Sequence, residues 1–254
     1  MTVKDFYDNF DENARLSGND NRHKVELYRK RFLYQYLIEM YNPKKVVQIA
    51  CGTGIHTHWL CEKYPHIEFY ASDIVDKHVE QLKDYKNLHK QVWDCTKNVL
   101  KEYKKVDMVL VEGAWYHLDL IGRKKLLKNL YAIDPKIIII DWLSAWHDTT
   151  QRLLQDKKSP LNYRNPRPNE PFRFDTADDL YALKRYFNVQ LFPVDLDLRF
   201  GYKDLNQVSE EEFNKYMSLM NEHFEIYDSN QTFIMDATEH GCYILTSKDT
   251  KYIY

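Results

Sequence analysis

The sequence contains little glycine: 7 of its 254 residues are glycine. Each loop glycine is therefore informative, because glycine serves where the backbone takes a positive φ or approaches a neighbour closely. The sequence also lacks an excess of either charge, with a formal net charge of -2. Because a broad positive field supplies much of the non-specific affinity for nucleic acid, we expect no nucleic-acid partner.

Cysteine and long apolar segments are scarce as well. The four cysteines have no metal-ligand spacing and are scattered over predicted core elements, which is typical of reduced thiols in a cytosolic protein. The first ten residues are acidic and aromatic without an apolar run, and no segment has the length of a membrane span. We therefore expect a cytoplasmic protein without disulfides or membrane contact, and the sequence leaves its oligomeric state open.

Helices and strands are predicted to alternate over the first 140 residues. A helix is predicted from His23 to Met40, with an apolar stripe formed by Val25, Tyr28, Phe32, Leu33, Tyr36, Leu37 and Met40. Short apolar runs predict strands at 45–49, 67–71, 90–93, 106–111 and 137–140. Because helices that connect strands of one sheet act as crossovers between parallel strands, this order predicts a doubly wound α/β fold.

The pattern changes after Asp141. Residues 147–174 hold four prolines among charged and aromatic residues and lack helical or strand periodicity, so we expect a lid insertion there. The elements predicted beyond it are a helix from Thr176, a strand near 187–192, a helix opened by a Ser209–Glu212 capping box, and a last strand at 241–246. The expected organisation is an N-terminal helical cap at 1–42 and one domain at 43–254 that contains the lid.

The loop after the first predicted strand has the composition of a cofactor-binding loop. Gly52 and Gly54 would let the backbone approach a ligand at the carboxyl end of a parallel sheet. A nicotinamide-binding fingerprint would need a small residue where Thr57 stands, which weakens that interpretation. Asp73 and Asp94 follow the next two strands, where they could bond ribose hydroxyls and an adenine amine. Three strand ends are therefore expected to converge on one nucleoside.

These residues resemble the class I S-adenosylmethionine-dependent methyltransferases. The resemblance rests on Val46-Val47-Gln48-Ile49-Ala50-Cys51-Gly52-Thr53-Gly54, Ser72-Asp73-Ile74, Asp94, the segment 107–118 with its Gly113-x-x-Tyr116-His117-Leu118 motif, residues 237–244 and the opening segment 6–16. The Gly-x-x-Tyr-His-Leu motif is similar to that of a small-molecule methyltransferase subgroup. The resemblance covers nearly the whole chain, and it implies a Rossmann-like, mostly parallel sheet of seven strands with an antiparallel last strand.

Two positions depart from the family pattern. The acidic residue usual at the end of the first strand is Gln48, which we expect to hydrogen-bond the neighbouring backbone. The first glycine of the usual loop is Ala50, which would cost only a methyl group if its φ is negative.

The resemblance implies methyl transfer from S-adenosylmethionine to a small-molecule acceptor, with S-adenosylhomocysteine as the product. The residues expected at the cofactor are Gln48, Ala50, Cys51, Gly52, Gly54, Asp73, Ile74, Asp94, Cys95, Glu112 and Gly113. Those expected at the acceptor are Tyr7, Arg15, Tyr116 and His240. His117 is the candidate general base, because histidine titrates near neutral pH and a protonated acceptor would need a base.

Other interpretations of these residues stay open. His117 and His240 could be packing residues, and the lid could be a solvated loop. His56 and His58 are two apart on a predicted helix and face different directions, so we expect no metal site. A methyltransferase acting on protein or RNA would need a basic surface around the pocket. A sensor that binds the nucleoside without catalysis is the alternative from another functional class.

Overall fold

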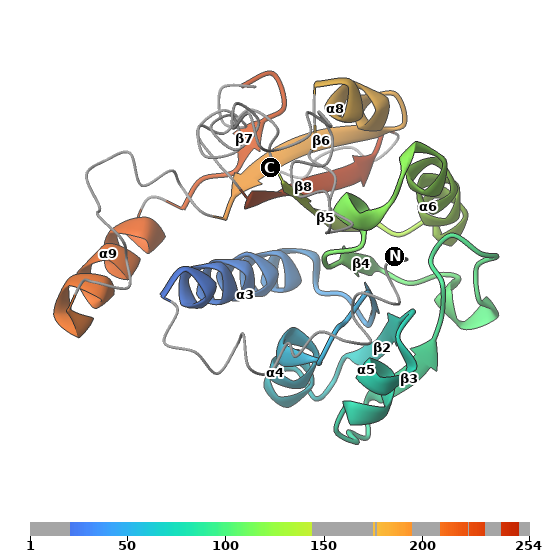
Figure 1. Ribbon diagram of the computed structural model, residues 1–254, viewed down its shortest axis with the longest axis horizontal. Helices are drawn as coiled ribbons and strands as arrows, with labels where there is room; N and C mark the ends of the chain where they lie inside the picture. Colours follow the sequence, from blue (N-terminus) through green and yellow to red (C-terminus); the bar gives the residue numbers. More distant parts are fainter. Residues whose placement is uncertain are drawn as a thin grey trace, which may run out of the picture.

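The computed structural model describes residues 21–143, 175, 177–194, 209–222, 224–231 and 240–248. Its centre is an eight-stranded sheet with strand order β3-β2-β1-β4-β5-β8-β6-β7 (Figure 1). The strands are β1 (Lys45–Ile49), β2 (Glu68–Asp73), β3 (Leu88–Val92), β4 (Met108–Val111), β5 (Ile137–Leu143), β6 (Phe187–Pro193), β7 (Tyr227–Asp228) and β8 (His240–Ser247). The α-helices are α3 (Asn21–Tyr41), α4 (Ile55–Lys63), α5 (Asp76–Gln81), α6 (Leu120–Ile133), α8 (Ala177–Lys184) and α9 (Glu210–Glu222), and the short 3-10 helices are η1 (Lys101–Tyr103) and η2 (Trp115–His117).

The strand order confirms the doubly wound α/β fold. Strands β1 to β5 are mutually parallel, whereas β8 runs antiparallel between β5 and β6. The chain builds outward from β1 to β3 and then returns to add β4 and β5 on the other side. The loops after β1 and β4 therefore meet at the point where the strand order reverses, which is where open α/β sheets bind ligands. The seven longer strands match the expected number, and the structure adds the two-residue strand β7.

The sheet has a core on each face because its central strands are buried on both sides. Val47 and Val109 face a cluster that includes Leu126 of α6. Val46 and Leu110 alternate with them and face a second cluster, which includes residues of α3 and α4. Continuous apolar strands of this kind are typical of a parallel sheet covered by helices on both faces.

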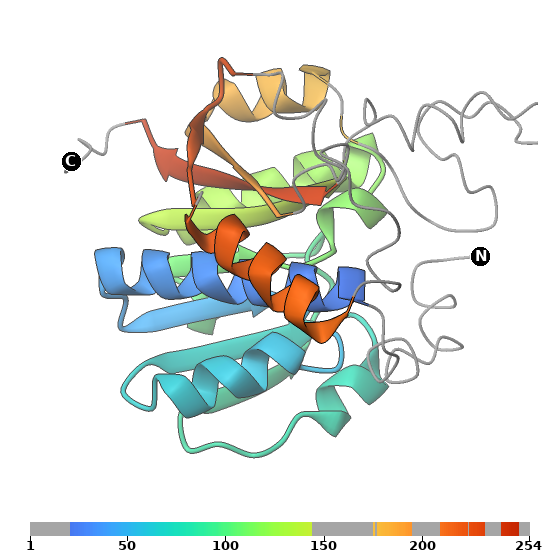
Figure 2. The same ribbon diagram turned by 90° about the vertical axis from the view of Figure 1, so that its left-hand side faces the viewer.

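Helix α3 packs on the sheet with a different face from the one that the apolar stripe predicts. Tyr28, Phe32, Tyr36 and Met40 of that stripe are 37–53% exposed. The buried residues of the helix are Val25, Arg29, Lys30, Leu33, Tyr34, Leu37 and Ile38. The predicted stripe is thus wrong in part, because two charged side chains lie on the buried face. Helix α9 lies beside α3 (Figure 2), and the Phe32 and Tyr36 rings pack 4.8 and 4.9 Å from that of Phe224.

Three smaller features also bear on the sequence-based expectations. Ser209 and Glu212 form the predicted capping box, with the Ser209 backbone N–H donating to Glu212 Oε2 at 2.8 Å and the Glu212 N–H donating to Ser209 Oγ at 3.3 Å. All four cysteines are free and buried. Among the described residues, no helix is long and apolar enough to cross a membrane. The expected lid at 147–174 and residues 1–20 of the expected cap lie outside the described part of the chain.

Candidate functional site

The loop between β1 and α4 is a tight turn that requires glycine. The Cys51 backbone N–H donates to the Ser72 carbonyl of β2 at 3.0 Å, and the Gly54 N–H donates to the Cys51 carbonyl at 3.0 Å. Gly52 and Gly54 have φ values of 53° and 81°, in the left-handed region. A Cβ atom at Gly54 would lie 2.2 Å from Leu82 Cδ2. The loop is thus held against the end of β2, as the sequence predicts.

Ala50 opens this loop with a φ of 59°, so the condition of a negative φ, under which alanine would cost only a methyl group, is not met. A side chain in the left-handed region costs about 1–2 kcal/mol, because its Cβ crowds the following carbonyl oxygen. We therefore expect Ala50→Gly to raise the free energy of unfolding by about 1 kcal/mol, after the greater entropy of the unfolded glycine chain is subtracted. Chemical denaturation measures this change.

The matched control is Ala132→Gly on the exposed side of α6. It should lower the free energy of unfolding by about 0.5–1 kcal/mol, because glycine in a helix loses more conformational freedom on folding than alanine does. Changes of opposite sign in the free energy of unfolding for the two glycine substitutions would identify the strain at residue 50. A destabilised Ala50→Gly variant would show that the loop does not hold this conformation.

Asp73, the last residue of β2, joins the loop to its neighbours. Its Oδ2 accepts the Gly52 backbone N–H at 2.9 Å, and its Oδ1 accepts the Val75 N–H at 2.9 Å. A carboxylate has about four lone-pair positions, so further acceptor capacity remains. The residue is 6% exposed, and Ile74 beside it is half-buried. Asp73 is therefore placed to accept ligand hydroxyls next to the glycine loop.

Asp94 lies just beyond β3 at the same edge of the sheet. The Trp93 backbone N–H donates to the Asp73 carbonyl at 2.9 Å, which holds the two strand ends together. Asp94 Oδ1 accepts the Thr96 N–H at 2.8 Å and the Thr96 hydroxyl at 2.7 Å. Cys95 is buried, and burial raises the pKa of its thiol to about 12. The structure thus brings the predicted residues together, with Cys95 as a neutral packing residue.

Gln48 contacts a side chain where a backbone contact was expected. Its Oε1 accepts the Thr57 hydroxyl of α4 at 2.6 Å, while its backbone carbonyl accepts the Ser72 hydroxyl at 3.3 Å. The expectation of a side-chain bond to the neighbouring backbone is therefore wrong. Because the Gln48 amide oxygen accepts the Thr57 hydroxyl, the donors of the Gln48 amide nitrogen point to other groups of the interior.

Glu112 places a carboxyl group directly after β4. Its backbone N–H donates to the Ile49 carbonyl at 2.9 Å, immediately before the glycine loop. Burial raises the pKa of this carboxyl to about 7, although Lys30, Gln48 and Tyr34 all favour its charged form. Glu112 Oε1, the Tyr34 hydroxyl and the Gln48 amide nitrogen are buried without a well-aligned hydrogen bond. These three polar groups lie close enough to interact with one another.

Gly113 and η2 place two aromatic residues beside the same loop. Gly113 has a φ of 74°, and a Cβ atom there would lie 3.0 Å from the Tyr116 hydroxyl oxygen. The Tyr116 ring lies 4.7 Å from the His117 ring and 6.5 Å from the His240 ring of β8. Gly113, His117 and His240 thus each lie close to Tyr116. Tyr7 and Arg15 lie outside the described residues.

The two histidines of α4 have separate environments. His56 is buried with its ring 5.4 Å from that of Tyr34, whereas His58 Nε2 accepts the Lys83 backbone N–H at 3.1 Å. In the described ranges, no group of three or more histidine, cysteine, aspartate or glutamate side chains is arranged to hold a metal ion.

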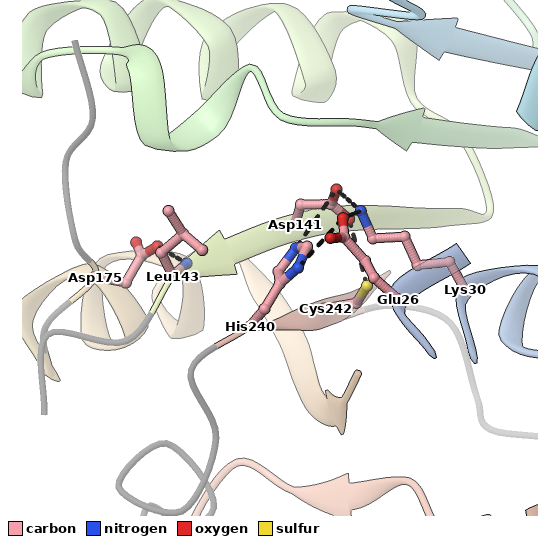
Figure 3. A network of polar contacts seen from close by, with 7 residues as sticks. All are labelled: Glu26, Lys30, Asp141, Leu143, Asp175, His240 and Cys242. Atoms are coloured by element: carbon pink, nitrogen blue, oxygen red, sulfur yellow. Dashed lines mark hydrogen bonds and ion pairs between the residues drawn. The ribbon is translucent and has the colours of Figure 1, made fainter. Parts of the chain in front are cut away.

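A buried ion-pair network lies next to Tyr116, and the sequence analysis did not predict it. Lys30 Nζ lies 3.0 Å from Glu26 Oε1 and 2.5 Å from Asp141 Oδ2 of β5 (Figure 3). His240 Nδ1 lies 3.4 Å from Glu26 Oε1, and Nε2 lies 3.8 Å from Asp141 Oδ2. The Cys242 thiol donates to Asp141 Oδ1 at 3.4 Å. Glu26 and Lys30 lie outside the apolar stripe predicted for α3, so that stripe gave no sign of the network.

Mutual attraction keeps this network charged despite its burial. Burial opposes the charge on His240, but Glu26 and Asp141 outweigh it and raise the pKa of His240 to about 9. Burial also opposes the charge on Asp141, but Lys30 and His240 hold its pKa at about 2. At neutral pH the network therefore pairs two cations with two anions at the ends of β5 and β8.

Comparison with known proteins finds a family match in the middle of the chain. Residues 46–133 match the family described as "Methyltransferase domain" (Methyltransf_25). A Mycoplasma genitalium protein named "Putative tRNA methyltransferase MG248" is 24% identical over 133 residues, which are 48% of this chain and 61% of that protein. The match therefore spans about three fifths of the relative's length.

Solved structures share the fold at low sequence identity. A SAM dependent methyltransferase from Archaeoglobus fulgidus has a TM-score of 0.53 at 19% identity, over 88% of this chain and 94% of that one. The small RNA methyltransferase HEN1 has a TM-score of 0.55 at 13% identity, over 88% and 26%. The plantazolicin methyltransferase BpumL in complex with SAH has a TM-score of 0.53 at 13% identity, over 95% and 93%.

The names of these relatives refer to more than one kind of acceptor. Two of them name RNA, so the sequence-based expectation of no nucleic-acid partner is not supported. What the solved structures share with this chain is the fold. Residues 46–133 thus match the methyltransferase-domain family, and the chain has the fold of the class I S-adenosylmethionine-dependent methyltransferases.

Proposed function

We propose that this protein transfers a methyl group from S-adenosylmethionine to a small-molecule acceptor. The observation that carries the proposal is the convergence of the glycine loop, Asp73, Asp94 and the Glu112-Gly113 turn at one edge of the sheet. That edge is the reversal point of the strand order, where a nucleoside cofactor is expected in this class of fold.

The residues present suit this cofactor. A Cβ at Gly54 or Gly113 would meet neighbouring side chains, so glycine at both positions leaves the backbone without a side chain at this edge. Asp73 would accept the ribose hydroxyls and Asp94 the adenine amine, with Ile74 and Cys95 beside the adenine. Glu112 and Gly113 would line the methionine end. S-adenosylmethionine supplies an electrophilic methyl group on a sulfonium, so the protein mainly has to orient the acceptor and exclude water.

The acceptor would lie beside Tyr116, His117 and His240. When the acceptor atom carries a proton, a base must take that proton as the new bond to the methyl carbon forms and the neutral thioether leaves. We assign this role to His117, which belongs to the same group as Tyr116. Tyr7, Arg15 and the lid at 147–174 are proposed for the acceptor side, and they lie outside the described residues.

Calorimetric titration with S-adenosylhomocysteine tests the cofactor site directly. We expect saturable binding by the wild type and a loss of affinity of about 10- to 100-fold in Asp73→Asn, because a hydrogen bond to a charged group contributes about 1.5–3 kcal/mol. Asp84→Asn, at an exposed side chain, is the matched control. Equal affinity in all three proteins would reject the assignment of Asp73.

Methyl transfer is tested with radiolabelled donor and a metabolite extract. We expect labelled small molecules in the extract and a loss of labelling in His117→Ala. Unchanged turnover in that variant would remove His117 as the base. Binding of the donor without labelling of any acceptor would favour the non-catalytic sensor.

An RNA acceptor is the second candidate, and the specific observation is the name of the curated relative at 24% identity. The same assay with total RNA in place of the extract separates the two acceptors. Labelling of RNA at a greater rate than of small molecules would replace the first proposal with the second.

A further inference from the structure

Exposed lysines gather on one face of the molecule, which α6 and the segment 94–107 between β3 and β4 form together. Over residues 94–134 the exposed acids are Glu102, Asp119 and Asp134. Asp119 caps α6, where its side chain accepts the Gly122 backbone N–H. The exposed cations of the same stretch, which we call the lysine face, are Lys97, Lys101, Lys104, Lys105, Lys124, Lys125 and Lys128.

Direct contacts hold α6 and the segment 94–107 together. The Asn129 amide of α6 donates to the Cys95 carbonyl at 2.7 Å and to the Lys97 carbonyl at 2.5 Å. Tyr103 of η1 and Leu126 of α6 belong to the same core cluster, so both segments cover the same face of the sheet. They lie side by side at the right of Figure 1. The lysines that they expose therefore share one surface.

The fold itself gives no reason for this concentration of positive charge. None of the seven lysines forms an ion pair with a described residue, whereas Lys90 and Lys136 pair with nearby acids. Lys124 and Lys128 stand four residues apart on α6, so their like charges repel. The lysines of α6 also stand outside its last turn, where the helix dipole would favour them. Charges that cost stability in this way indicate a partner that neutralises them.

The net charge of the chain conceals the lysine face because acids gather on the other side of the molecule. Helix α9 lies on the opposite side from α6 (Figure 1). The exposed charged residues of 209–231 are Glu210, Glu211, Glu212, Lys215, Glu222, Glu225 and Asp228. The sequence-based argument against a nucleic-acid partner used the average of the two sides. A partner meets the local field of one side instead.

The composition of the face suits a phosphate backbone that carries unpaired bases. All seven cations are lysines, which act as point charges and suit phosphate contacts that do not depend on sequence. Tyr131 of α6 is 71% exposed, and the exposed His89 ring stacks on Tyr70 at 4.5 Å, beside Tyr103 of η1. Exposed rings among cations bind single-stranded nucleic acid, because bases stack on the rings. Unpaired bases of this kind are typical of the loops and ends of RNA.

We propose that the lysine face binds single-stranded RNA, with lysines on the phosphates and Tyr131 stacked on a base. The Lys97 backbone N–H donates to the Asp94 carbonyl at 2.9 Å, so the face borders the cofactor edge of the sheet. The inference goes beyond the proposed function, because the lysines lie outside the residues assigned to cofactor and acceptor. RNA docked there is able to serve as the acceptor, but the contact does not require it to do so.

Fluorescence anisotropy with a labelled, unstructured RNA of about 20 nucleotides measures this binding, since such a strand exceeds the usual site size. We expect binding at low salt that weakens as salt is added. The slope of the logarithm of affinity against the logarithm of salt concentration should be about -3 to -5, because each phosphate contacted on a single strand contributes about -0.7.

A variant with Lys124→Gln, Lys125→Gln and Lys128→Gln removes three cations at exposed positions. At about 50 mM salt we expect it to bind RNA about 10- to 100-fold more weakly than the wild type, with a slope less steep by about 2. The matched control is Lys83→Gln, Lys86→Gln and Lys215→Gln, at exposed lysines outside the face. It has the same net charge and should bind RNA within about twofold of the wild type. Both variants should bind S-adenosylhomocysteine as the wild type does.

Tyr131→Ala separates RNA from other polyanions. We expect it to bind RNA about fivefold more weakly or worse at every salt concentration, with the salt slope unchanged, because a stacked base is lost and no phosphate contact is. Its affinity for inorganic polyphosphate should equal that of the wild type, because polyphosphate has no bases.

The contrary outcomes are specific. Absence of RNA binding, or an equal loss in the lysine-face variant and the control variant, overturns the proposal. Tighter binding of polyphosphate, duplex DNA or vesicles of phosphatidylglycerol and phosphatidylcholine than of RNA also overturns it, because the face would then serve another partner. If the wild type binds RNA through these lysines but does not bind S-adenosylhomocysteine, the cofactor assignment fails while the RNA contact stands.

Discussion

Replacing Lys30 by methionine should lower the free energy of unfolding by about 3–5 kcal/mol, which is the usual cost of removing one partner from a buried ion pair. Lys30 Nζ contacts Glu26 and Asp141, and its side chain is 5% exposed. Methionine fills a similar volume but leaves two buried carboxylates with only His240 as a counter-charge. Urea denaturation measures the loss.

The pH dependence identifies the network as the cause. The pKa of Asp141 is lowered to about 2, so its stabilising effect is present above its usual pKa and is lost as the pH falls toward 2. The wild type and Lys30→Met should therefore differ most near neutral pH and converge below pH 4. Lys125→Met, at an exposed position of α6, should change stability by less than about 0.5 kcal/mol. If the free energy of unfolding of Lys30→Met lies within about 1 kcal/mol of the wild-type value at pH 7, the ion pairs of the network are not formed in solution.

Replacing Arg123 by methionine should also lower the free energy of unfolding by about 3–5 kcal/mol, because it leaves a second buried carboxylate without its cationic partner. Arg123 of α6 lies 2.8 Å from both Asp175 Oδ1 and Asp179 Oδ1, and its Nε donates to the Trp115 carbonyl at 3.1 Å. The Trp115 indole N–H also donates to Asp175 at 2.6 Å. The guanidinium therefore joins α6 and α8 to η2, the short helix that contains Tyr116 and His117.

The loss in Arg123→Met should be larger at pH 8 than at pH 5. Burial raises the pKa of Asp175 to about 7 even though Arg123 lowers it. A raised carboxyl pKa means that the folded state holds a proton that the unfolded state releases, so stability falls as the pH rises from about 4 to 7. Without Arg123 the pKa rises further and the decline continues to higher pH. Guanidinium chloride denaturation at the two pH values, with exposed Arg185→Met as the control, measures the difference. An equal loss at both values would mean that Asp175 is solvated in the variant.

Much of the fold can be predicted from the sequence because buried parallel strands have continuous apolar sequences. Lys45–Ile49 was predicted with the bounds that β1 has, and Ile137–Ile140 lies within β5. The glycine loop and the acids after β2 and β3 were predicted to meet for the same reason, since the carboxyl ends of parallel strands share one edge. The capping box at Ser209 is equally local, because it depends on two side chains three residues apart.

Three features of the site depend on contacts between distant residues. The sequence pattern misplaced the buried face of α3, because Lys30 is charged and its partner Asp141 lies 111 residues away. The φ of Ala50 follows from the bond between Cys51 and β2, which overrides the preference of alanine. The role of Gln48 likewise depends on Thr57 and Glu112, which stand on two different elements.

The sequence by itself therefore determined the class of the sheet, the order of its elements and the edge at which a nucleoside cofactor is expected. Hydrophobic periodicity and loop composition are properties of neighbouring residues, so they can be seen without a structure. Only the tertiary structure decided which carboxyl groups near that edge are paired with cations and which one, Glu112, has its pKa raised by burial. Burial and the distances between charges on separate elements set the ionisation of Asp141, Asp175 and Glu112, and these quantities exist only after the chain has folded.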